Sequence, residues 1–273
     1  MRTSEASRSG RHKRRGFWPA MRVLALLASP AALTVSAATT APAATAPAAT
    51  ASAAITAPAG PAVPAAPAVP AAPGADWHAT VRQFAEQHLK HPAWGYSHCV
   101  RDYELAKALA RADQVPLDDD VLFAAAYLHD VAAFAPWSRE QQGIDHADEA
   151  ARIVDTFLAG TGFPMSKIER VRAAIRTHMF DRTPIGPEAL YLHDADALDW
   201  LGAIGVARII ALVDPNGGDP DGPKAVKMLE DNLREVPPRV LSPAGRRRMP
   251  ERRDELARFL RELKRESGDL RTL

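Results

Sequence analysis

The chain has 273 residues, 47% of them hydrophobic, which is enough for one substantial core. Its net charge of +1 is unevenly distributed: residues 1–22 carry seven basic residues and one acidic residue, and the remainder has a net charge of −5. An acidic domain is poorly suited to binding long nucleic acid. The single cysteine, Cys99, excludes an internal disulfide.

Residues 1–37 have the pattern of an export signal. The basic start is followed by an uncharged, mostly apolar stretch from Val23 to Ala37, which ends in the small residues of a signal peptidase site. The pair Arg14-Arg15 leaves open a signal of the twin-arginine type. We expect a periplasmic or secreted protein, or a membrane-tethered one if the signal is not cleaved. Pro30 argues against a stable membrane-spanning helix, which needs about 20 apolar residues.

Residues 38–75 form a predicted linker. They are almost entirely Ala, Pro and Thr, and they carry no charge. Frequent prolines prevent a continuous helix and favour an extended spacer. We therefore expect this Ala/Pro-rich segment to be disordered.

Residues 76–273 are predicted to form one all-α domain. Apolar residues recur every three or four positions without strand-like alternation, and Gly or Pro separates the segments. Ser166 to Glu169 has the pattern of a capping box, and Ser242-Pro243 that of a capped helix start. The spacing predicts helices near 76–90, 98–112, 118–133, 146–158, 167–180, 187–213, 223–235 and 243–266.

A His-Asp doublet, His129-Asp130, follows an apolar run from Val121 to Leu128. The run predicts a buried helix that carries two ionisable groups into the interior, where unpaired charge is costly. Together with His98 and Asp196, the doublet offers imidazole and carboxylate ligands, which hold Zn, Mn, Fe, Ni, Co or Mg ions. These four side chains predict a metal site, and a polar pair at a helix end is the alternative interpretation of the doublet.

The aspartate that joins this site is not settled by spacing. Asp196 and Asp199 are three residues apart and share a helix face, whereas Asp194 lies on another face. All three lie in an otherwise apolar helix, so the polar cluster is expected to face a partner.

Four motifs occur in the order found in the HD-domain phosphohydrolase superfamily. They are Ser97 to Arg101, Leu128 to Asp130, His146 to Ala151, and Asp194 to Asp199 followed by Leu201 to Arg208. In these motifs the chain resembles that superfamily, and within it the compact stand-alone bacterial subgroup, over about residues 84–266. The resemblance implies an HD-domain helical bundle whose metal ligands are His98, His129, Asp130 and Asp196. Asp196 is chosen because it occupies the place of the last aspartate of the family.

The activity implied by this resemblance is hydrolysis of a phosphate ester or a nucleotide phosphoanhydride with a divalent metal ion. The partner would be a small phosphorylated molecule, nucleotides included. In such chemistry the ion lowers the pKa of a bound water from about 15.7 towards about 7. Asp130 would orient that water. Arg101, one turn after His98, is a candidate for stabilising phosphoryl charge. Its alternative is a structural pair with Asp102 or Glu104.

Two further histidines, His146 and His178, fall where two-metal members recruit extra ligands. They are predicted to bind a second metal or a phosphate group, with polar capping as the alternative. The chain departs from the subgroup at Thr177, Met179 and Ala197, where polar contacts are usual, and in the loop after the doublet. These departures keep two alternatives open, a catalytically inactive metal- or ligand-binding module and, less favoured, a two-iron oxygenase. The oligomeric state is not predicted.

Overall fold

The computed structural model describes residues 76–272, so the predicted export signal (1–37) and linker (38–75) lie outside the described residues. The α-helices of this part are α2 (Trp77–His88), α3 (Tyr96–Ala112), α4 (Asp119–Leu128), α5 (His146–Leu158), α6 (Ile168–Arg176), α7 (Pro187–Asp199), α8 (Gly202–Ile210), α9 (Gly222–Glu235) and α10 (Pro243–Glu266). Short 3₁₀ turns are η2 (Val131–Ala133), η3 (Glu140–Gln142), η4 (Met165–Lys167) and η5 (Pro237–Arg239). Residues 76–272 contain no strand, which confirms the predicted all-α class. No helix among them has the length and apolarity needed to span a bilayer.

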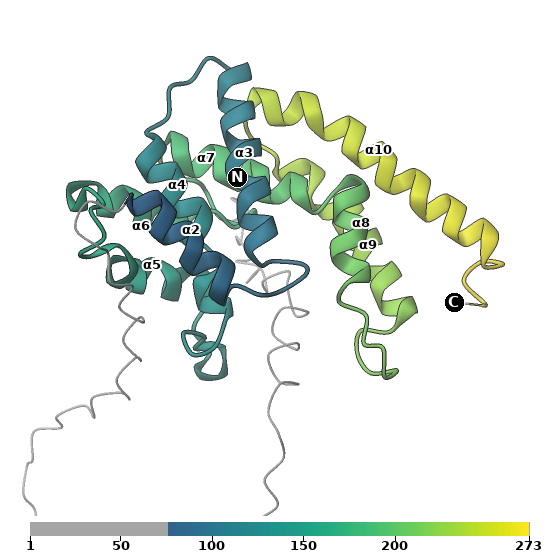
Figure 1. Cartoon of the computed structure of the whole chain (residues 1–273). Helices are drawn as coiled ribbons and strands as arrows, with labels where there is room; N and C mark the ends of the chain where they lie inside the picture. The colour runs from purple at the N-terminus through teal and green to yellow at the C-terminus, as the bar shows by residue number, and fades with distance from the viewer. Residues whose placement is uncertain (1–75, 273) are drawn as a thin grey trace, which may run out of the picture. The chain divides into compact units, whose positions relative to one another are not determined.

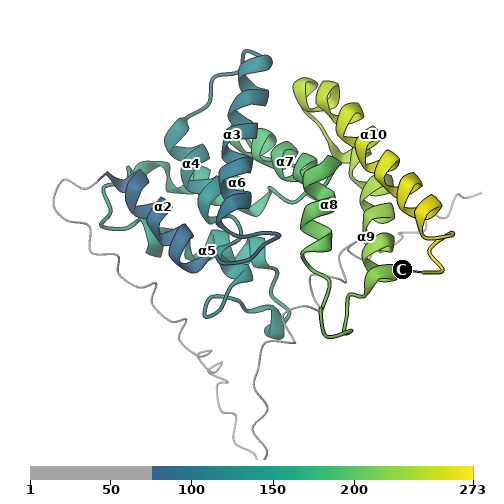
Figure 2. The same ribbon diagram turned by 45° about the vertical axis from the view of Figure 1, so that its right-hand side comes forward.

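The helices form two neighbouring groups (Figures 1 and 2). α2 to α7 gather around α4, and α8, α9 and the long α10 lie beside them. α3 packs against both α4 and α7, and α10 packs against α8 and α9. Every residue from Val121 to Leu128 is buried, as the apolar run predicts. The doublet that follows this run therefore enters the centre of the larger group.

Side chains cap several helix starts. Asp76 accepts a hydrogen bond from the backbone N–H of His78, Asp145 from that of Ala147, and Asp221 from that of Lys224. Each bond satisfies an N–H group that has no partner within its helix. The predicted cap at Ser242 is confirmed, because its Oγ accepts from the N–H of Gly245 at 3.0 Å.

The predicted capping box at Ser166 to Glu169 is wrong. The chain already turns in η4, and α6 begins at Ile168 with Lys167 as a cap residue that makes no side-chain cap bond. Ser166 therefore lies inside a helical turn, where its side chain is past the capping position. The same helix ends at Arg176 and not near 180, which leaves His178 in the connection that follows.

The single helix predicted for residues 187–213 is also wrong. α7 ends at Asp199, and α8 begins at Gly202 after Leu201 has adopted an extended conformation. Gly202 has φ +66, a left-handed conformation that glycine adopts without a Cβ clash. The break turns α8 so that Arg208 reaches Asp199.

Candidate metal centre

Side chains that can bind a metal ion converge from five segments distant in sequence. α3 supplies His98 and Asp102, the turn after α4 supplies His129 and Asp130, α5 supplies His146, the connection after α6 supplies His178, and α7 supplies Asp196. All are buried apart from His146, whose side chain keeps 15% exposure. The helix ends before the doublet, and this places both of its side chains in the same cluster. The structure thus brings together all six predicted metal and phosphate residues and adds Asp102.

The ring orientation of three of these histidines is set by neighbouring acceptors. Nδ1 of His129 donates to the carbonyl of Ala126 at 2.9 Å, and Nδ1 of His178 donates to the carbonyl of Ile175 at 2.6 Å. Nδ1 of His98 bonds a carboxylate, that of Asp199, at 2.9 Å. Because a neutral imidazole carries one N–H, these bonds leave Nε2 of each ring as the atom with a lone pair. This is the usual arrangement of metal-binding histidines, in which the second nitrogen is fixed by a hydrogen bond.

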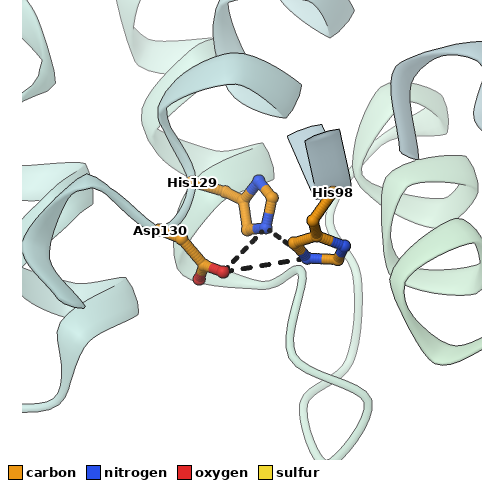
Figure 3. A group of neighbouring side chains, drawn as sticks. All are labelled: His98, His129 and Asp130. Atoms are coloured by element: carbon orange, nitrogen blue, oxygen red, sulfur yellow. Dashed lines mark hydrogen bonds and ion pairs between the residues drawn. The ribbon is translucent and has the colours of Figure 1, made fainter. Parts of the chain in front are cut away.

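The Nε2 atoms of His98 and His129 lie 3.3 Å apart, and both face Asp130 (Figure 3). Oδ2 of Asp130 lies 3.3 Å from Nε2 of His129 and 3.7 Å from Nε2 of His98. Asp196 places Oδ1 3.4 Å from the same His98 atom. With bonds of about 2.0–2.2 Å to one ion, two ligand atoms lie no more than about 4.3 Å apart. The separations among His98, His129 and Asp130 therefore fit a common metal ion, and Asp196 approaches the same His98 nitrogen.

Asp130 lies between two groups of ligand atoms. Its Oδ2 faces His98 and His129, whereas its Oδ1 lies 3.3 Å from Nε2 of His146 and 3.9 Å from Nε2 of His178. The three residues Asp130, His146 and His178 form a second compact set of candidate ligands. One carboxylate thus has an oxygen available for each of two neighbouring ions.

Electrostatic coupling within the cluster is strong. Burial opposes the charge on Asp130, but the imidazoles of His129 and His146 hold its pKa well below the usual range. Burial likewise opposes a charge on His129, yet Asp130, Asp102 and Asp196 raise the pKa of that imidazole to about 10. The pKa of His178 moves the other way, well below its usual value, because of burial and the neighbouring His129. Without a metal ion the cluster therefore holds a proton on His129, at the position where ligand atoms converge.

Asp199 anchors two arginines and one histidine beside the cluster. It accepts from Nε and Nη2 of Arg101 at 2.9 and 2.8 Å and from Nη1 of Arg208 at 3.0 Å. Arg208 is buried, its guanidinium lies 3.5 Å from the centre of the Trp200 ring, and its Nη2 lies 3.4 Å from Nε2 of His98. Arg101 thus pairs with Asp199 and not with either acid considered from sequence. Its predicted role towards a phosphoryl group stays a prediction.

Asp102 is the residue that sequence reasoning missed. Its Oδ2 lies 3.2 Å from Nε2 of His98 and 3.9 Å from Nε2 of His129. Burial, with the nearby carboxylates of Asp199 and Asp196, raises its pKa well above the usual range. The available signal was its spacing, because residues four apart on a helix share a face. Asp102 was considered only as a partner of Arg101.

The three departures from the family pattern have structural roles. Thr177 donates through Oγ1 to the carbonyl of Ala173 and accepts from the N–H of Ile185. Met179 and Ala197 are buried in the core. These side chains fill interior positions, so the two groups of ligand atoms on either side of Asp130 form without them.

Comparison with known proteins concerns the family and the fold. Residues 95–201 match the model of the HD domain family. Among solved structures, the chain is similar to a Lactobacillus plantarum protein, with 21% identity over 70% of this chain and 97% of that chain and a TM-score of 0.52. It is also similar to Bacillus subtilis YpgQ in complex with ADP, with 20% identity over 69% of this chain and 97% of that chain and a TM-score of 0.52. At these identities the likeness concerns the fold. A search of curated proteins finds no match.

Proposed function

We propose that this chain, which belongs to the HD-domain superfamily through residues 95–201, is a metal-dependent phosphohydrolase. HD domains bind divalent metal ions, and the described residues hold His/Asp clusters suited to one. The observation that carries the proposal is the pair of Nε2 atoms, from His98 and His129, that face each other at 3.3 Å. Two lone pairs at that distance repel each other, so either a proton on one of the rings or a metal ion must lie between them, and the carboxylates around them favour the ion.

The residues have distinct roles in this proposal. His98, His129, Asp130 and Asp196 would hold the ion, which supplies Lewis acidity and a water of lowered pKa when bound. Asp130 would orient the attacking water through the oxygen that it does not commit to that ion. His146 and His178 would hold a second ion or a phosphate oxygen next to this oxygen. The 4% exposure of Asp130 and Asp196 keeps bulk water from competing.

Arg101 is the candidate for stabilising phosphoryl charge. Its bonds to Asp199 use Nε and Nη2, and its side chain keeps 31% exposure. We expect Arg101→Ala to lower kcat while metal affinity stays the same. A fall in metal affinity of the same size would instead assign Arg101 a positioning role through Asp199 and His98.

A nucleotide is the substrate class that we propose to test first. The support is the fold shared with YpgQ, which was solved with ADP. Nucleoside di- and triphosphates present the anhydride bonds and the metal-binding oxygens that such a centre can act on.

The test measures metal content and the release of phosphate and pyrophosphate by the full-length chain. Mn, Ni, Mg, Co, Zn or Fe(II) is supplied with a panel of nucleotides and phosphomonoesters, beside the Asp130→Ala variant. We expect turnover by the wild type that the variant loses. Bound metal without turnover on any substrate would favour a binding module, and oxygen consumption would favour an oxygenase. No bound metal would overturn the proposal.

A further inference from the structure

A fully buried carboxylate, that of Asp102, points into the metal cluster without a hydrogen-bond donor of its own. Its exposure is 0%, and within residues 76–272 neither oxygen accepts a hydrogen bond. Buried carboxylates are ordinarily paired or bound to metal, since desolvation of the charge is costly. Asp194 illustrates the ordinary case in the same core, because it accepts bonds from the N–H groups of Leu241 and Ser242 at 2.9 and 2.6 Å.

The position of Asp102 relative to the proposed ligands is that of a further ligand. An oxygen of Asp102, an oxygen of Asp196 and a ring nitrogen of His98 lie within 4.8 Å of one another. The distances of 3.2 and 3.9 Å to the Nε2 atoms of His98 and His129 are within the span of about 4.3 Å that one ion allows. Asp102 therefore faces the Nε2 atoms of His98 and His129, which are also the atoms that Asp130 faces.

We propose that Asp102 is an additional ligand of the metal held by His98, His129, Asp130 and Asp196, and that it makes this centre oxygen-rich. The inference rests on the metal centre of the proposed function and adds to it a preference among ions. Two imidazoles and three carboxylates favour a hard, six-coordinate ion such as Mn²⁺ or Mg²⁺, whereas fewer carboxylates favour Zn²⁺.

The test uses Asp102→Asn, which removes the charge and keeps the shape. Mn²⁺ and Zn²⁺ are titrated into metal-stripped full-length chain, and the thermal unfolding of the metal-free form is recorded. We expect Mn²⁺ affinity to fall by at least about tenfold. Losing only the hydrogen-bond partner of a metal ligand costs about that much, and losing a ligand should cost at least as much. Zn²⁺ affinity should fall less. The metal-free variant should unfold at the same or a higher temperature, because a buried carboxylate without a hydrogen-bond partner has been removed.

Asp194→Asn is the matched control, since Asp194 is equally buried but hydrogen-bonded. It should lower the unfolding temperature and leave both metal affinities unchanged. If Asp102→Asn instead behaves like this control, Asp102 is structural and the inference is overturned while the proposed function stands. If the wild type binds neither ion, both fail.

A second measurement decides the matter even if Asp102→Asn does not fold. In Asp102→Cys, a sulfur at this position would bond Co²⁺ and produce the absorption band of a cobalt–thiolate bond. The wild type, which retains the buried Cys99, provides the baseline. A new band in the variant supports coordination by position 102. Co²⁺ binding without that band overturns it.

Discussion

The orientation of the His98 ring depends on Asp199. Asp199 is hydrogen-bonded to Nδ1 of His98 and forms ion pairs with Arg101 and Arg208. Because its neighbours are two guanidinium groups and an imidazole, its pKa lies well below the usual range even though burial opposes this. It therefore links the metal centre to the helix that follows the break after α7.

We predict that Asp199→Asn lowers metal affinity by about 10- to 100-fold, the usual effect of losing the partner of a ligating histidine. Arg208 is 2% exposed and would lose its carboxylate, which costs about 3–5 kcal/mol of unfolding free energy. Metal titration and urea unfolding measure the two effects. Asp231→Asn is the control, because Asp231 also pairs with two basic side chains, Lys227 and Arg234, but at the surface. Unchanged metal affinity in Asp199→Asn would contradict the role of this hydrogen bond.

At the scale of elements, the break between α7 and α8 decides where Arg208 lies. A Cβ added at Gly205 would overlap the backbone carbonyl of Trp200, so the backbone of the turn would have to shift. We expect Gly205→Ala to lower stability by about 1–3 kcal/mol, the usual cost of overpacking a core position, and to weaken the Arg208–Asp199 pair. Ala203→Ser, at an exposed position of the same helix, is the control. Thermal unfolding compares them, and equal stability of the two variants would show that the turn can relax.

The end of α3 is joined to α7 and α10 by Asp113. It accepts from the hydroxyl of Tyr191, from the N–H of Ala244 and from the guanidinium of Arg247. Burial raises the pKa of Asp113, but these donors outweigh it and hold the pKa below the usual value. A lowered pKa stabilises the fold above the unfolded-state value near 4, and this contribution disappears as the pH falls through the folded-state value.

We predict that Asp113→Ala costs about 1–3 kcal/mol at pH 7, the usual value for losing charged hydrogen bonds. The difference between wild type and variant should begin to shrink below about pH 4, where the carboxylate of the unfolded wild type takes up a proton, and should be lost as the pH falls through the lower folded-state pKa. Urea unfolding at several pH values measures this, with Asp254→Ala, an exposed residue of α10, as control. A difference that does not change with pH would mean that the hydrogen bonds act without the charge.

The sequence predicts elements better where a local signal exists than where a tertiary contact decides. The apolar run before the doublet and the cap at Ser242 are local, and both are confirmed. The break at residues 200–202 depends on Gly202, which lies close to Arg252 and Glu255 of α10. The apolar 3.6-residue period continues through this break, so the sequence pattern does not reveal it. The spacing of Asp102 from His98 is local, but the complete burial that makes Asp102 a candidate ligand follows from the packing of α3 on α7.

At the scale of the whole molecule, the metal centre joins helices from across the larger group. Its ligands come from α3, α5, α7 and the segments after α4 and α6. A bound ion would tie these elements to one another, and removing it would leave buried carboxylates facing one another. The stability of the described domain is therefore expected to depend on the ion.

We predict that a chelator lowers the unfolding temperature of the full-length chain and that added divalent ion restores it. An ion at 100 times its Kd stabilises the folded state by about 2.7 kcal/mol, which corresponds to roughly 5–10 °C for a domain of about 200 residues. Thermal scans over a series of Mn²⁺ concentrations measure the effect, with monovalent salt at equal ionic strength as control. Asp130→Ala should lose the response, because Asp130 faces both groups of ligand atoms. A wild-type unfolding temperature that ignores the ion would separate the cluster from the folding of the domain.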